Sequence, residues 1–243
     1  MKQKIKSLLL FGSVLVCGLP GFISAASPKA GDFFTAGKTT EKKFALTFDD
    51  GPGLRTAEFL DLLDKYQVKA TFFLLSNKVK NRPEVAKQIL ARGHEIANHT
   101  TQHENYKLIH RKLVKQDPKN GAELAKQMLI NDMKESREVI EKTLGVKMLY
   151  LRMPYGIDGA WIHEAAKTAG FVLVNWTWGA DWDGAPAEKL IPGYVQALKP
   201  GAIILLHDGW PKSEKSLAIT EAVLNAAQEK GLKIVTVGEL LEK

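Results

Sequence analysis

The chain has 243 residues, of which 45% are apolar and 25% are charged. This composition is typical of a folded globular protein with a sizeable core, and the length allows one large domain or two small ones. The formal net charge is +7, but three of the lysines lie within the first six residues. The remaining excess favours an anionic polymer as a neighbour and is too small to predict nucleic-acid binding.

The first 26 residues have the pattern of a secretory signal peptide. Residues 1–6 carry lysines and no acid, residues 7–23 are almost entirely apolar, and small residues follow. We therefore expect cleavage after Ala26 and a secreted or periplasmic mature protein without a membrane anchor. The alternative is an anchor, but glycines and a proline interrupt an apolar run that is short for a membrane span. The only cysteine, Cys17, lies in this segment, so no disulfide is expected in the mature chain.

Residues 27–41 are predicted to form a short leader, and from residue 42 to 243 strand-like and helix-like segments alternate in one domain. The predicted strands cover residues 43–48, 69–76, 94–99, 148–153, 171–178, 202–208 and 233–237. The predicted helices cover residues 55–67, 82–93, 121–145, 161–170, 187–201 and 216–231, and Pro192 can break the fifth. This alternation predicts right-handed crossovers and a single α/β domain of the barrel type.

In parallel α/β folds, ligands bind at the carboxyl ends of the strands. Most of the unusual ionisable residues follow a predicted strand directly. They are Asp49 and Asp50, His99 and His103, Arg152, Asp181, and finally His207 and Asp208. The sequence therefore predicts that these side chains meet at one end of the sheet.

The chemistry of this set favours a metal site. His99 and His103 are four residues apart, so a helical turn would direct both imidazoles to one side. Two exposed surface histidines are the alternative for this pair alone. Together with Asp50 they form a set of two histidines and one carboxylate, which leaves coordination positions open and is typical of a catalytic metal. Zn²⁺ suits these ligands, although Co²⁺, Ni²⁺ or Mn²⁺ can occupy such a site. The neighbouring Asp49 is then free to act as a base, and the cation offsets the repulsion between the two acids.

Five short motifs, "TFDDGP", "HTTQH", "RMPYG", "DW" and "LLHD", occur in this order along the chain. Their order and spacing resemble the polysaccharide deacetylase family, the NodB-homology carbohydrate esterases of family 4. The resemblance covers residues 42–243. It implies a deformed (β/α) barrel of about seven parallel strands and metal-dependent removal of N- or O-acetyl groups from sugar polymers. The chain departs from the family pattern at Glu104, where many relatives have proline, and at Gly179, where many have an acid.

The resemblance also implies roles for individual residues. Asp49 would be the general base, oriented and kept ionised by Arg152, while Asp50, His99 and His103 would hold the metal. His207 would be the general acid that protonates the departing amine, and Asp181 would hold His207. Trp182 and Leu206 would line the acetyl pocket, and the amide N–H near Tyr155 would help to bind the oxyanion.

The substrate is the part of the function that these motifs specify least. Peptidoglycan is the first expectation, because an exported catalytic domain meets it directly. Chitin or poly-N-acetylglucosamine comes second and acetylated xylan third. The alternatives are a different metal hydrolase and a carbohydrate-binding protein with a vestigial site. Residues 106–143 are expected to form a wall of the groove. Trp161, Trp176, Trp178 and Trp210 could belong to the core or could stack on sugar rings.

Overall fold

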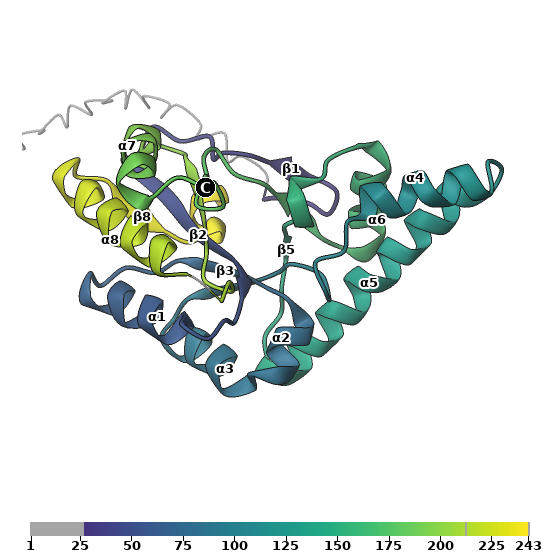
Figure 1. The fold of residues 1–243 in the computed structure, drawn as a ribbon, viewed down its shortest axis with the longest axis horizontal. Coiled ribbons are helices and arrows are strands. Elements are labelled where there is room, and N and C mark those ends of the chain that lie inside the picture. The colour runs from purple at the N-terminus through teal and green to yellow at the C-terminus, as the bar shows by residue number, and fades with distance from the viewer. Residues whose placement is uncertain (1–26, 212, 243) are drawn as a thin grey trace, which may run out of the picture.

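The computed structural model describes residues 27–211 and 213–242, so the predicted signal peptide lies outside the described residues. Its centre is an eight-stranded, entirely parallel sheet (Figure 1). The strands are β1 (Phe33–Phe34), β2 (Lys43–Gly51), β3 (Thr71–Leu74), β4 (Glu95–Asn98), β5 (Tyr150–Leu151), β6 (Val172–Val174), β7 (Ile203–His207) and β8 (Lys233–Val235).

The strands are ordered β1-β6-β5-β4-β3-β2-β7, and β8 pairs with the first part of β2. Beyond the end of β6, Trp178 forms an isolated parallel bridge with Ile204 of β7. This bridge joins the segment after β6 to β7, at the opposite end of the series, and closes the sheet into a distorted barrel. The parallel pairing places the carboxyl ends of all strands at one rim, as the alternation of segments predicts.

Helices cover the outside of the barrel (Figure 1). They are α1 (Thr56–Lys65), α2 (Ser76–Asn81), α3 (Pro83–Ala91), α4 (Tyr106–Gln116), α5 (Gly121–Leu144), α6 (Ala160–Ala169), α7 (Ala187–Ala197), α8 (Glu214–Glu229) and α9 (Val237–Leu241), with a short 3₁₀ turn at Pro154–Gly156. Pro192 lies inside α7 without ending it. In Figure 1, α4 and the first part of α5 form a hairpin that extends away from the barrel. Among the described residues, no helix is both long enough and apolar enough to cross a membrane.

The period-two alternation of strand side chains divides the core into two layers. On β2, Leu46 and Phe48 pack outward with the helices, whereas Ala45 packs inside the barrel. The outer layer is the larger and contains most of the buried leucines and phenylalanines. Each such buried side chain contributes about 1.5–3 kcal/mol to the free energy of folding, relative to the same side chain left exposed.

Several elements differ from the sequence-based expectations. Phe33–Phe34 of the predicted leader forms β1, which pairs with β6 at Leu173 and Val174. Helix α4 was not predicted, because four cations interrupt its apolar residues and only Tyr106 is buried. The C-terminal segment turns into α9 at Val237, where Thr236 and Glu239 form a capping box that ends the strand.

Candidate active site

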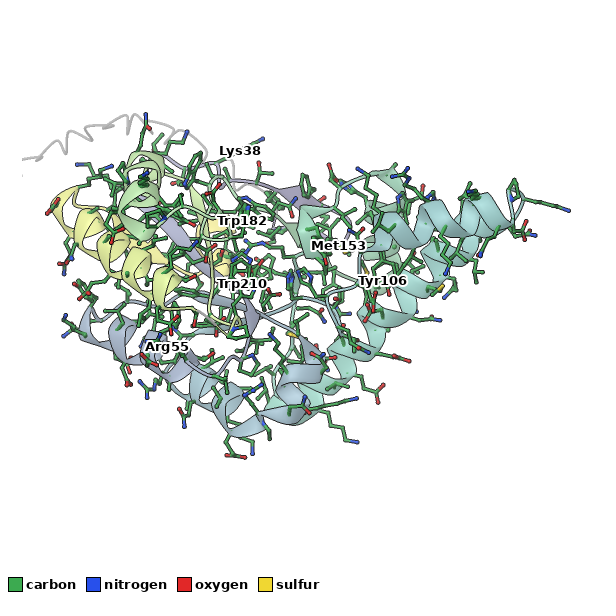
Figure 2. The ribbon with its side chains drawn as sticks, in the orientation of Figure 1. Lys38, Arg55, Tyr106, Met153, Trp182 and Trp210 are labelled. Atoms are coloured by element: carbon green, nitrogen blue, oxygen red, sulfur yellow. The ribbon has the colours of Figure 1, made fainter. Side chains whose placement is uncertain are left out.

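The predicted site residues meet at the carboxyl rim of the barrel, around a cavity of about 490 Å³. The polar lining comes from Asp49, Asp50, His99, His103 and His207, and the aromatic lining from Tyr155, Trp176, Trp182 and Trp210. Figure 2 labels Trp182 and Trp210 near the middle of the molecule. The structure therefore brings together residues that are separated by more than 150 positions in the chain, such as Asp49 and His207.

Asp49 and Asp50 both line the cavity although they are adjacent in a strand, where successive side chains point to opposite faces. The pairing of β2 with β3 shifts register between Asp49 and Gly51, which is the signature of a β-bulge. Asp50 has a φ of 67°, in the left-handed region. This local departure from alternation directs the second carboxylate to the same side as the first.

Asp50, His99 and His103 offer ligand atoms that all lie within 4.8 Å of one another. Asp50 Oδ1 is 3.5 Å from His99 Nε2 and 3.5 Å from His103 Nε2. This oxygen is buried and has no hydrogen-bond partner among the described residues. A buried, unpaired carboxylate oxygen facing two imidazole nitrogens fits a divalent cation, which would satisfy all three atoms.

The surrounding groups support that fit. Burial alone would raise the pKa of Asp50, but the His99 and His103 imidazoles and the Trp210 N–H hold it below its usual value. Burial lowers the pKa of His103, which favours the neutral, ligating imidazole. His99 Nδ1 lies 2.8 Å from the carbonyl oxygen of Arg152. A proton donated there leaves the lone pair of Nε2 directed at Asp50.

The two histidines do not converge through a helical turn, so that expectation was wrong. Residues 99–103 form an irregular loop between β4 and α4. Thr100 and His103 adopt φ values of 72° and 60°. These two left-handed residues reverse the chain and return His103 to the side of His99, which is an effect of loop conformation rather than of helical spacing.

Arg152 is completely buried inside the barrel and contacts Asp49. Its Nη1 donates to Asp49 Oδ1 at 2.7 Å and to Thr47 Oγ1 at 2.9 Å. The other donors bond to the carbonyl oxygens of Val174 and Asn175, each at 3.0 Å. Since both partners are buried, a charge-assisted bond of this length holds the Asp49 carboxylate in position.

His207 and Asp181 form a second buried pair. His207 Nδ1 lies 2.8 Å from Asp181 Oδ1, and Asp181 Oδ2 accepts bonds from the His207 backbone N–H and the Ser216 hydroxyl. Burial by itself would lower the pKa of His207, but the hydrogen bond and charge of Asp181 raise it above the usual value. The imidazole is therefore favoured in its protonated form and presents Nε2 to the cavity. Gly179, the departure from the family pattern, has no room for a side chain beside Leu205.

Trp210 is a site residue for which the sequence assigned no definite role. Its Nε1–H donates to Asp50 Oδ2 at 2.7 Å, and its ring stacks on His207 with centroids 4.1 Å apart. The predicted Trp182 contacts the same imidazole edge-on at 5.7 Å. Tyr155 is 62% exposed, and its ring contacts that of His103 with centroids 4.5 Å apart. The position of Trp210 three residues after His207 was the available sequence signal.

The assignment of Leu206 to the acetyl pocket was wrong. Leu206 is fully buried in the outer core layer, among residues that pack against the helices. Leu205 lines the cavity instead. The reason is strand alternation: Leu205 lies two residues before His207 on β7 and shares its face, whereas Leu206 points the other way.

A buried polar cluster supports the loops behind the site. Lys78 Nζ donates to the carbonyl oxygens of Asp50 and Gly209, at 2.8 and 2.9 Å, and so joins the loop after β2 to the loop after β7. Asp208 is fully buried and accepts a hydrogen bond from the Thr56 hydroxyl. Burial raises the pKa of Asp208 to about 7. Asp208 therefore packs beneath the site and does not line the cavity.

Known proteins resemble this chain in sequence and in fold. A family model described as "Polysaccharide deacetylase" matches residues 36–174. A peptidoglycan-N-acetylglucosamine deacetylase of Bacillus cereus is 34% identical over 205 residues, which cover 83% of this chain and 89% of the relative. A chitooligosaccharide deacetylase of a Bradyrhizobium species is 35% identical over 172 residues, which cover 70% of this chain and 72% of the relative.

Solved structures give the same result for the fold. The crystal structure of a peptidoglycan N-acetylglucosamine deacetylase in complex with 4-naphthalen-1-yl-N-oxidanyl-benzamide superposes with a TM-score of 0.74 at 28% identity, covering 87% of this chain and 93% of that chain. This similarity confirms the α/β barrel of the NodB type that the motifs predict.

Proposed function

The chain belongs to the polysaccharide deacetylase family, and we propose that it is a metal-dependent hydrolase that removes acetyl groups from the N-acetylated amino sugars of peptidoglycan. One observation carries the proposal. The possible metal ligands Asp50, His99 and His103 lie in one cavity with the acid–base candidates Asp49 and His207. Amide hydrolysis needs an activated water, a proton donor for the leaving nitrogen and stabilisation of negative charge.

The base side of the reaction uses Asp49. A cation held by Asp50, His99 and His103 would supply Lewis acidity, which lowers the pKa of water and polarises a carbonyl oxygen. Asp49 takes the proton of the water whose oxygen attacks the acetyl carbon. The Arg152 Nη1 bond of 2.7 Å holds the Asp49 carboxylate in position at the cavity. The backbone at Tyr155, which has a φ of 61°, lies beside the cavity where an amide N–H can meet the oxyanion.

The acid side uses His207. As the carbon–nitrogen bond breaks, His207 donates its proton to the sugar amine, and acetate leaves. Asp181 favours the protonated imidazole and fixes its orientation, because its carboxylate accepts the bond at Nδ1 and leaves Nε2 for the substrate. Leu205 and Trp182 line the cavity beside His207, where an acetyl methyl group is small and apolar enough to fit.

The choice of peptidoglycan rests on the relative from Bacillus cereus, whose name specifies that substrate and which this chain matches over 89% of its length. A chitooligosaccharide is the second candidate, because the Bradyrhizobium relative bears that name. Export through the predicted signal peptide is part of the proposal, since it would bring the enzyme to the cell wall. Residues 1–26, which carry that expectation, lie outside the described part of the chain.

The test is acetate release from purified peptidoglycan and from N-acetylglucosamine oligomers, followed by mass spectrometry for the loss of acetyl groups. We expect release from peptidoglycan, abolition by a chelator, and recovery when Zn²⁺ is added back. Release that continues after exhaustive chelation would contradict the metal assignment. Sugar binding without any acetate from either polymer would favour a carbohydrate-binding protein instead.

A further inference from the structure

Helix α4 carries four exposed cations and no acid: Lys107, Arg111, Lys112 and Lys115. None of the four side chains forms an ion pair with any residue in the ranges 27–211 and 213–242. This face is called the α4 cationic face below. It lies on the hairpin that extends from the barrel in Figure 1.

Several other surface helices pair at least one of their cations with an acid within one turn. Arg55 pairs with Glu58 at 2.6 Å, Lys87 with Glu84 at 2.8 Å and Lys126 with Glu123 at 2.9 Å. On α4, by contrast, the neighbours of Arg111 at four residues in each direction are Lys107 and Lys115. Like charges at this spacing repel and weaken a helix. A solvated helix face usually mixes both signs, so an uncompensated row of cations indicates an anionic ligand from outside the chain.

The α4 cationic face is fixed to the metal-binding loop through Asp132 of α5. Asp132 Oδ1 accepts from the backbone N–H of Thr101, which lies between His99 and His103, at 3.0 Å. Asp132 Oδ2 accepts from the Tyr106 hydroxyl in the first turn of α4 at 2.9 Å. Figure 2 labels Tyr106 at the barrel end of the hairpin. The helix therefore starts at a defined position beside the cavity.

One aromatic contact lies on the cavity rim, and a second lies between α4 and α6. Tyr155, on the rim of the cavity, contacts His103 at 4.5 Å. Trp161, at the start of α6, stacks on His110 of α4 with ring centroids 4.9 Å apart. The first contact holds the cavity rim against His103, and the second holds α4 against the start of α6.

We infer that the α4 cationic face binds the carboxylates of the short peptides on the glycan strand whose N-acetylated sugar occupies the cavity. This inference rests on the proposed function and extends it, because it makes the charged peptide part of the recognised substrate. The bonds of Asp132 to Thr101 and Tyr106 place the start of α4 next to the loop of His99 and His103, which favours charged groups of the polymer bound in the cavity as the occupant. Lys107, Arg111 and Lys115 follow one another at a rise of about 6 Å. Several carboxylates of one polymer can thus pair with cations along one side of the helix.

The experiment compares two variants that change net charge equally. The first replaces Lys107, Arg111, Lys112 and Lys115 with glutamine, which keeps helix propensity close to that of lysine and arginine. The control replaces four exposed lysines outside α4 that also lack ion pairs in the described residues: Lys42, Lys142, Lys189 and Lys199. Each protein is tested for co-sedimentation with insoluble peptidoglycan and for kcat and KM on soluble peptidoglycan fragments and on neutral N-acetylglucosamine oligomers.

We expect the α4 variant to bind insoluble peptidoglycan about tenfold more weakly, the sum of several small exposed charge contacts. Its KM on peptidoglycan fragments should rise by a similar factor, while kcat and all values on the neutral oligomers stay unchanged. The control variant should match the wild type. Amidation of the peptide carboxylates or added salt should remove the difference between the α4 variant and the wild type.

Equal losses on neutral and charged substrates, or equal losses in the control variant, would overturn the inference. So would α4-dependent binding to polyphosphate or anionic phospholipid vesicles that exceeds binding to peptidoglycan. The proposed function fails separately: if no form of the protein releases acetate, co-sedimentation alone still decides whether α4 binds the carboxylated polymer.

Discussion

Replacing Trp210 with phenylalanine is expected to weaken metal binding while leaving the cavity largely intact. The indole N–H donates to Asp50 Oδ2 at 2.7 Å, and the other oxygen of that carboxylate faces His99 and His103. Phenylalanine keeps an aromatic ring for the stack on His207 but has no donor. The substitution therefore removes one bond that orients a metal ligand without touching any ligand.

The size of the effect follows from the burial of the bond. A hydrogen bond to a charged group contributes about 1.5–3 kcal/mol. Trp210 is partly exposed, so water can replace part of the lost donor, and the lower end of that range applies. We expect Zn²⁺ to bind about tenfold more weakly, which is also the lower end of the effect of removing an outer-shell partner.

The assay is a Zn²⁺ titration of the metal-depleted protein in competition with a chromophoric chelator. Trp182→Phe is the matched control, because Trp182 contacts His207 edge-on and donates no hydrogen bond to Asp50. An affinity of Trp210→Phe within twofold of the wild type would refute the reasoning. An equal loss in Trp182→Phe would refute it too, since the effect would then come from ring packing.

Three further predictions concern the acid–base groups and stability. Asp49→Asn should retain Zn²⁺ in the same titration yet lose about 10²-fold or more in kcat, because the asparagine oxygen can still accept from Arg152 but the amide cannot take the proton of the water; near-normal turnover would exclude Asp49 as the base. Asp181→Asn should lower the pKa of His207, which Asp181 raises, so the alkaline limb of the kcat–pH profile should move to lower pH and kcat should fall about 10²-fold; an unmoved limb would contradict the pairing. Burial lowers the pKa of His94 to about 4 from 6.5, so its stabilising contribution is complete above pH 6.5 and declines as the pH falls toward 4, by about 2 kcal/mol at pH 5. Urea unfolding at pH 7.5 and pH 5 should show that decline in the free energy of unfolding of the wild type and a smaller decline in His94→Gln. An equal decline in the two proteins would show that His94 is not its source.

The sequence predicted the larger elements of the fold because their periodicity is strong. Helices α1, α3, α5, α6 and α8 and most barrel strands lie within a few residues of the expected ranges. It missed β1 and α4 for a common reason. Two residues, Phe33 and Phe34, become a strand only because β6 offers them a partner. In α4 only Tyr106 is buried, and four more side chains are half-buried. Elements that depend on distant contacts leave little local signal.

The site divides in the same way. By itself the sequence determined which residue types end each strand, and because parallel strands end at one rim, it predicted that Asp49, Asp50, the two histidines, Arg152 and His207 would share a site. Only the tertiary structure decided how they share it. A bulge and a left-handed φ turn Asp50 beside Asp49, an irregular loop returns His103 to His99, and strand alternation exchanges Leu206 for Leu205. The sequence determines the residue types and their order along the strands. The direction of each side chain depends instead on backbone angles, which packing between distant segments imposes.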